Sequence, residues 1–101
     1  MNVEVIKQDS GEVTLKVDGR IDTVTAKSFE ASAMSVLSEK PSQIVMDCSE
    51  LAYVSSSGLR VFLMLQKGVN AAGTKMRIIN MSDAIKQVFK ITGFASILNI
   101  E

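Results

Sequence analysis

The stretch QIVMDCSELAYVSSSGLRVF, residues 43–62, decides the fold of this chain. Its apolar triplet Ile44-Val45-Met46 predicts a buried strand over residues 43–47, central in a sheet. From Leu59 onward, apolar residues recur at helical spacing as far as Gly73, which closes the helix. Ser55 can cap this helix by accepting a backbone N–H from the second or third helical residue. A strand that leads into a helix in this way indicates an α/β architecture.

The sequence on either side predicts the remaining elements. Valines alternate with polar residues around residues 3–5 and 13–17, and the turn at residues 8–11 joins them into an antiparallel hairpin. A first helix is expected over residues 25–39 and ends before Pro41. A strand over residues 75–80, a third helix from Ser82 to Gly93 and an extended piece over residues 96–100 follow. We therefore predict one α/β domain over residues 1–101, a mixed sheet with an antiparallel N-terminal hairpin and then parallel strands, against which the helices pack.

The composition excludes several classes of function. Eleven basic residues balance eleven acidic ones, so no excess positive charge favours nucleic acid or an anionic membrane as a partner. The longest apolar runs are far shorter than the roughly 20 residues that span a bilayer, and no signal peptide precedes the first strand, so we expect a cytoplasmic protein. The chain has no histidine and a single cysteine. It is therefore expected to have no catalytic residues, no metal site and no cofactor, and not to be an enzyme.

The candidate functional site is the run Ser55-Ser56-Ser57. If Ser55 is the cap, Ser56 is the first helical residue and its hydroxyl points to solvent, near the carboxyl end of a strand, where open α/β sheets place their sites. Gly58 would let the backbone of another protein approach closely. A phosphoryl group on Ser56 would be tolerated by the helix N-terminus but not by a partner resting on it. In the alternative interpretation, three small polar residues merely fill a turn between strand and helix.

Further candidates surround the serines. The second helix is apolar nearly all round because Val61 and Met64 extend its apolar stripe, and Met64 on the outward side could contact a partner. Asp22 follows a strand and precedes a helix, where it can cap that helix or take part in binding, and the two roles are compatible. Cys48 lacks a neighbouring base and is expected to be a passive small residue. The predicted partner-binding residues are Asp22, Ser55, Ser57, Gly58, Leu59 and Met64.

The chain as a whole resembles the STAS domain, in particular the small single-domain anti-sigma factor antagonists of bacteria. The resemblance covers essentially all of the sequence and is specific only as a combination of motifs. These are Gly19-Arg20-Ile21-Asp22 followed by Ala26, the strand at residues 44–47, the loop YVSSSGL at residues 53–59, and VFKITGF at residues 88–94 with Ile97-Leu98.

The resemblance implies a protein that binds an anti-sigma factor, itself an ATP-dependent serine kinase, and thereby frees a sigma factor for transcription. In this family the kinase phosphorylates the first serine of an Asp-Ser-Ser/Thr-Gly loop, which ends binding, and a serine phosphatase reverses the modification. Ser56 corresponds to that serine, Asp22 to an acidic loop residue near it, and Gly58-Leu59 to a contact pair. Ser55 stands where the family has an aspartate, and this change removes a negative charge from the loop.

Two alternatives to this function stay open at this point. The first is a constitutive scaffold subunit of a signalling or transport assembly, in which Ser56 has only a structural role. The second is an enzyme or a binder of small ligands, which the lack of histidine and of a glycine-rich phosphate loop disfavours. The free protein is expected to be a monomer.

Overall fold

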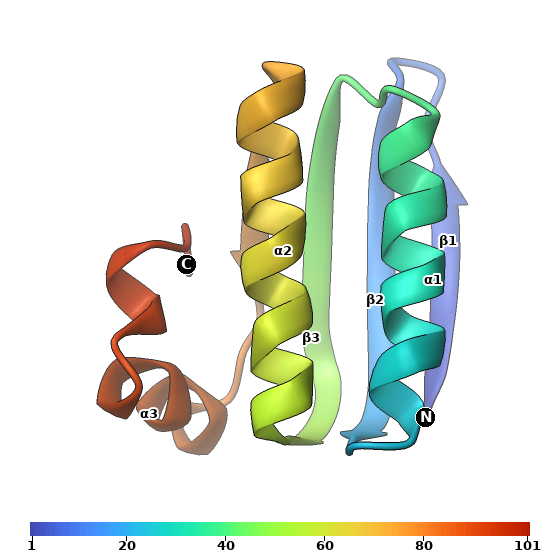
Figure 1. Cartoon of the computed structure of the whole chain (residues 1–101). Coiled ribbons are helices and arrows are strands. Elements are labelled where there is room, and N and C mark those ends of the chain that lie inside the picture. The colour runs from blue at the N-terminus through green and yellow to red at the C-terminus, as the bar shows by residue number, and fades with distance from the viewer.

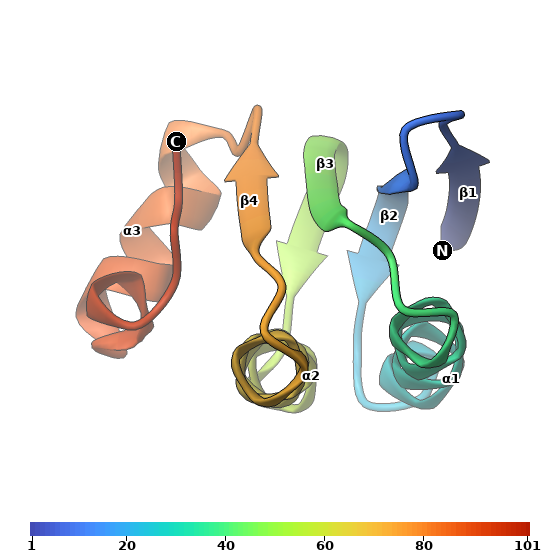
Figure 2. The same ribbon diagram turned by 90° about the horizontal axis from the view of Figure 1, so that it is seen from above.

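The computed structural model describes all 101 residues. Strands and helices alternate after the first hairpin, and Figures 1 and 2 show them in two views. In chain order the elements are β1 (Asn2–Lys7), β2 (Glu12–Ile21), α1 (Thr25–Ser38), β3 (Gln43–Val54), α2 (Ser56–Ala72), β4 (Met76–Ile79), α3 (Asp83–Ile91) and the short 3-10 helix η1 (Phe94–Ser96).

The four strands form one mixed sheet in the order β1-β2-β3-β4. β1 and β2 are antiparallel, whereas β2, β3 and β4 are parallel to one another. The predicted α/β class, with an antiparallel hairpin followed by parallel crossovers, is confirmed. β3 lies inside the sheet as predicted, but it continues to Val54 and is longer than the expected strand at residues 43–47. Cys48 therefore lies within this strand and not after it.

The helices are distributed unequally around the sheet. α1 and α2 lie side by side on one face, and α3 lies beyond β4 at the edge (Figure 2). The core fills the space between the sheet and the helices. At its centre the ring of Phe62 lies between those of Phe29 and Phe89, with centroid distances of 5.3 and 5.2 Å. These aromatic contacts connect all three helices through α2.

The termini of the helices agree with the predicted caps. Ser82 accepts the N–H of Ile85 at the start of α3, and Gly73 ends α2 in the left-handed conformation with φ 73°. Val61, which extends the apolar stripe of α2, is buried in the core. One expectation was wrong. Of the extended piece expected at residues 96–100, Ser96 belongs to the helix η1, and only Ile100 pairs with β4, through Ile78. No helix has the length and apolar content that crossing a membrane requires.

Candidate functional site

Two loops emerge together at one end of the parallel strands. β2 ends at Ile21 and β3 ends at Val54, and these two residues are paired in register. The next residue, Ser55, donates its backbone N–H to the carbonyl oxygen of Ile21 over 2.8 Å. The loop that leads into α1 and the loop that leads into α2 therefore start side by side, at the lower end of the sheet in Figure 1. This arrangement brings Asp22 and the three serines to the same end of the molecule.

The N-terminus of α2 has the predicted geometry. Ser55 has an extended backbone, and its hydroxyl oxygen accepts the N–H of Gly58 over 3.2 Å. Its carbonyl accepts the N–H of Leu59 over 2.9 Å, which begins the helix. Ser56 is the first residue of α2 and is exposed, whereas Ser57 is half-buried. The Ser56 hydroxyl is therefore not needed to cap the helix.

Asp22 organises the turn before α1. Its Oδ1 accepts the backbone N–H groups of Val24 and Thr25 over 2.9 and 2.8 Å. The hydroxyl of Thr25 donates to the same oxygen over 3.1 Å. These bonds, chiefly the one from the Thr25 N–H, hold the pKa of Asp22 below its usual value. Asp22 therefore caps the turn that leads into α1, whereas the N-cap residue of α1 itself, Val24, has no side-chain cap. The Asp22 carboxylate is charged at neutral pH.

Gly58 and Leu59 face the core. Both are buried, and a Cβ at Gly58 would lie 2.7 Å from Cγ2 of Ile21 and 2.8 Å from Cγ2 of Val54. Packing inside the molecule therefore requires glycine at position 58. From the sequence, a different reason was expected, the close approach of another protein's backbone. That Gly58 and Leu59 contribute to partner binding stays a prediction. Because both are buried, their contribution is limited to positioning the start of α2 on the sheet.

Exposed apolar side chains lie on the elements around the serines. Met64, on the outward side of α2 as predicted, is 38% exposed. Val24, in the turn that Asp22 caps, is 80% exposed and was not identified from the sequence. Tyr53, near the end of β3, is 39% exposed, and the guanidinium of Arg20 lies 4.2 Å from its ring centroid. The sequence did contain a signal for the exposure of Val24. This apolar residue lies within the short polar turn Asp22-Thr23-Val24-Thr25, and such a turn has no room to bury it.

A groove of about 310 Å³ separates the first turns of α1 and α2 next to these loops. Ser57 lines it, so the groove adjoins the serine run. The other side chains that bear on its chemistry are Ala26, Lys27 and Glu30 from α1, and Arg60, Val61 and Met64 from α2.

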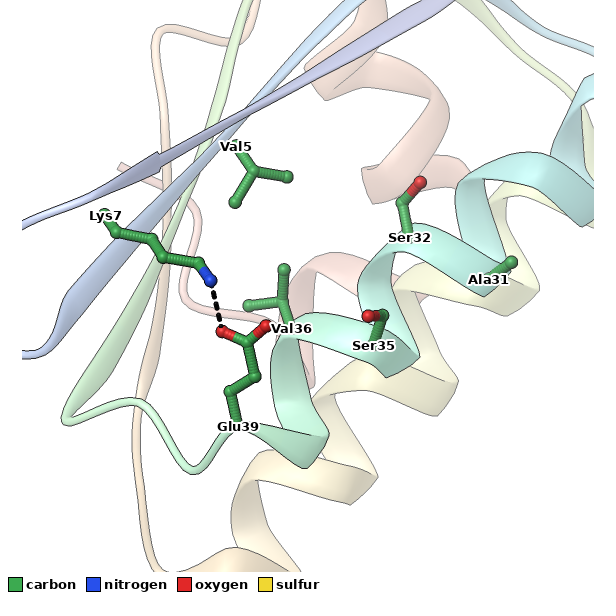
Figure 3. A pocket seen from close by; sticks show the side chains of 7 residues that line it. All are labelled: Val5, Lys7, Ala31, Ser32, Ser35, Val36 and Glu39. Carbon is green, nitrogen blue, oxygen red and sulfur yellow. Dashed lines mark ion pairs between the residues drawn. The ribbon is translucent and has the colours of Figure 1, made fainter.

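A second and larger groove lies between β1 and α1 (Figure 3). Its volume is about 710 Å³, and Val5, Ser32 and Val36 are among the residues that line it. An ion pair of 2.7 Å between Lys7 Nζ and Glu39 Oε2 crosses it near the end of α1 (Figure 3). None of the predicted site residues lines this groove.

Cys48 has the properties of a structural residue. It is 1% exposed, and burial, with a smaller contribution from the Asp47 carboxylate, raises the pKa of its thiol to about 12. The side chain is therefore a neutral thiol within the core. No group of three or more histidine, cysteine, aspartate or glutamate side chains is close enough together to hold a metal ion.

A four-stranded sheet with two helices on one face, and an exposed serine at the N-terminus of the second, is the arrangement expected of a STAS domain. The sequence profile of the STAS domain family matches residues 2–101, and the chain belongs to this family.

Curated relatives and solved structures agree with this assignment. The anti-sigma-B factor antagonist of Listeria monocytogenes is 28% identical over 102 residues, an alignment that covers 100% of this chain and 89% of that protein. The Bacillus subtilis protein of the same name is 28% identical and covers 99% of this chain and 92% of its own length. The anti-sigma factor antagonist SpoIIAA in its unphosphorylated form has the same fold, with a TM-score of 0.83 at 16% identity over 99% of this chain and 88% of that one.

Proposed function

We propose that this protein is an anti-sigma factor antagonist that binds an anti-sigma factor with serine kinase activity and dissociates when Ser56 is phosphorylated. The main observation that supports this proposal is that two neighbouring serines have different roles. Ser55 caps α2, and Ser56 beside it is exposed and has a hydroxyl that makes no hydrogen bond within the chain. Relatives that align over nearly their whole length are named anti-sigma-B factor antagonists, which supports the same role for this chain.

The fold can accept a phosphoryl group on Ser56. The first turn of a helix has unpaired backbone N–H groups and a partial positive charge, both of which favour an anion there. SpoIIAA, which shares the fold at 16% identity, has been solved in a phosphorylated as well as an unphosphorylated form. Phosphorylation is therefore expected to leave the domain folded and to act on the surface alone.

The surface around Ser56 explains why the modification would end binding. Val24 and Met64 expose apolar side chains at this end of the molecule, and a partner that covers them must exclude water. A phosphoryl group adds about −1.5 to −2 charges, whose desolvation in such an interface is costly. A serine phosphatase that removes the group would restore binding. In this scheme the chain is a regulator and a substrate, and it performs no catalysis itself.

The free protein is proposed to be a monomer. Val61, which could have joined Met64 in contact with a second copy, is already covered by the core of its own chain. Sedimentation at micromolar concentration should give the mass of one chain, and a stable dimer would contradict this point.

Phosphorylation by the cognate kinase tests the proposal directly. The kinase is the ATPase encoded in the same genome that binds the wild-type protein in a pull-down with purified components. With ATP, intact mass should increase by one phosphoryl group, fragment mapping should place it on Ser56, and Ser56→Ala should abolish it. The variants Ser55→Ala and Ser57→Ala serve as matched controls and should still be modified. Phosphate on Ser55 or Ser57 in the wild type would contradict the assignment.

Binding by variants separates the switch from the constitutive scaffold. Ser56→Asp should weaken association with the kinase by about 2 kcal/mol, roughly thirtyfold, because a charge is desolvated in the interface. Ser56→Ala should bind nearly as well as the wild type. Equal affinity of all three proteins would contradict the switch and favour the scaffold.

A further inference from the structure

We propose that the groove between α1 and α2 receives an acidic side chain of the partner, and that Arg60 pairs with its carboxylate. This inference deepens the proposed function and depends on it, because the partner is the protein that binds at the serine loop.

The groove lies between the first turns of α1 and α2. These two helices start at the same end of the molecule (Figure 1). α2 lines the groove with Ser57, Arg60, Val61 and Met64, which share one face of the helix because they are spaced by three and four residues. Thr23, Ala26, Lys27 and Glu30 line it from the side of α1 with the same spacing. Seven residues of a helix extend about 10 Å, so the groove is about two helical turns long and fits a short segment of a partner.

The floor and the rim of the groove differ in chemistry. Ala26 and Val61 are 5% and 4% exposed and form an apolar floor, and Met64 extends this apolar surface outward. Lys27 and Arg60 are exposed cations at the rim. An occupant that suits both parts has an apolar side chain that contacts the exposed Met64 above this buried floor, and a charged group directed at the cations.

The cations of the groove lack counterions within the chain. The two ion pairs of the molecule join Lys7 to Glu39 and Arg77 to Glu101, so neither Lys27 nor Arg60 has a carboxylate within 4.0 Å. Glu30 is the single carboxylate that lines the groove. The groove therefore has one more positive than negative side chain, and an acidic segment complements it whereas a basic one is repelled. The planar guanidinium of Arg60 can bind a carboxylate through two parallel hydrogen bonds.

Arg60 also connects the groove to the switch. It lies four residues after Ser56 on the same helix, so the two side chains are neighbours on one face. A phosphoryl group on Ser56 would lie next to the guanidinium and compete with the partner's carboxylate for it. The groove would thus lose its binding charge when the serine is modified, and part of the effect of phosphorylation would pass through Arg60.

Charge reversal on α2 provides the test, with the kinase that binds the wild-type protein as the probe. Arg60→Glu should weaken binding about tenfold or more, and Arg60→Gln by less. Lys67→Glu is the matched control, because Lys67 is an exposed cation on the same helix that does not line the groove. It should change affinity less than threefold, since only general charge attraction is altered. Equal melting temperatures of all variants establish that each one is folded.

A double-variant measurement tests the link to the switch. If a negative charge at position 56 acts partly through Arg60, the loss caused by Ser56→Asp should be at least threefold smaller in the Arg60→Gln background than in the wild type.

Three results would overturn the inference. Equal weakening by Arg60→Glu and Lys67→Glu would mean that only the overall charge of the protein matters. Unchanged affinity of Arg60→Glu would place the partner outside the groove. Tighter binding by Arg60→Glu would mean that a cation of the partner enters the groove. Each of these leaves the proposed function intact, because the wild type still binds and is still phosphorylated. A wild type that binds no kinase at all would instead contradict the proposed function and this inference with it.

Discussion

Ser55 connects the two loops of the candidate site to each other. Its N–H donates to the carbonyl oxygen of Ile21 over 2.8 Å, while its hydroxyl caps α2 by accepting the N–H of Gly58. The strand end before Asp22 and the helix start at Ser56 are therefore held by one residue. Changes at position 55 should affect the stability of the domain, whereas changes at position 56 should affect only what binds there.

Ser55→Ala should lower the free energy of unfolding by about 1 kcal/mol, because the cap is lost. Ser55→Asp should retain most of the stability, since a carboxylate caps a helix as well as a hydroxyl does. Ser56→Ala is the matched control and should change stability by less than about 0.5 kcal/mol. Urea denaturation followed by circular dichroism measures all three. A larger loss in Ser56→Ala than in Ser55→Ala would contradict the observed cap.

Gly58→Ala should lower the free energy of unfolding by about 1–3 kcal/mol, because the added Cβ meets the branched side chains of Ile21 and Val54 in the core. Gly68→Ala is the comparison within the same helix. There the added Cβ meets Cδ2 of the half-buried Leu37, a flexible side chain that can move aside, and alanine favours the helix. The second variant should therefore be close to neutral. Wild-type stability of Gly58→Ala would mean that the strand end has room for a side chain.

Regular periodicity explains how much of the fold could be predicted. The caps at Ser55 and Ser82 and the glycine that ends α2 follow local chemistry and were predicted correctly. The second half of β3 was missed because its buried residues, Leu51 and Val54, are three positions apart. The register between β2 and β3 shifts twice along this part, between Lys16 and Asp18 and between Gly19 and Arg20, so strict alternation is broken. A period of two cannot detect such a strand.

The candidate site was predicted in part. The exposure of two predicted residues was predicted correctly. The cap at Ser55 makes Ser56 the first helical residue, and helical spacing places Met64 on the outward side of α2. The burial of Val61 and the packing role of Gly58 depend on α1 and on the strand ends, which are distant in sequence and come into contact only in the fold. The groove between Lys27 and Arg60 also forms only when α1 and α2 come together in the fold. Contacts between separate elements therefore account for most of what the sequence did not reveal.

Asp22 should make the stability of the domain depend on pH. Its pKa is lowered in the folded state by the N–H groups of Thr25 and Val24, so its contribution is complete above the usual carboxyl pKa of about 3.9 and is lost as the pH falls through the lowered folded value. Asp22→Ala should therefore be less stable than the wild type at pH 7, and the difference should shrink in acid. Urea denaturation at pH 7, 5, 4 and 3 measures this. A difference that stays constant down to pH 3 would contradict the assignment.

Cys48 should be unreactive while the domain is folded. The thiol is 1% exposed and its pKa is raised to about 12, so both access and thiolate are lacking at pH 8. Reaction with a colorimetric disulfide reagent should be slow in native buffer and complete within minutes in concentrated urea. Ser49→Cys, combined with Cys48→Ala, provides a matched exposed thiol one position along the strand and should react at once. Rapid modification of the native wild type would mean that β3 opens readily.

Replacement of exposed apolar residues by glutamate should map the partner's footprint. Met64→Glu and Val24→Glu should each weaken binding to the kinase by about 2 kcal/mol, because an apolar contact is lost and a charge is buried. Ile91→Glu is the matched control, since Ile91 is 75% exposed at the end of α3, which lies beyond β4 and away from α1 (Figure 2). All three positions are exposed, so the variants should melt at the wild-type temperature. Titrations that show equal losses at Ile91 and Met64, or a loss at Ile91 alone, would move the footprint to the α3 side of the sheet and away from Ser56.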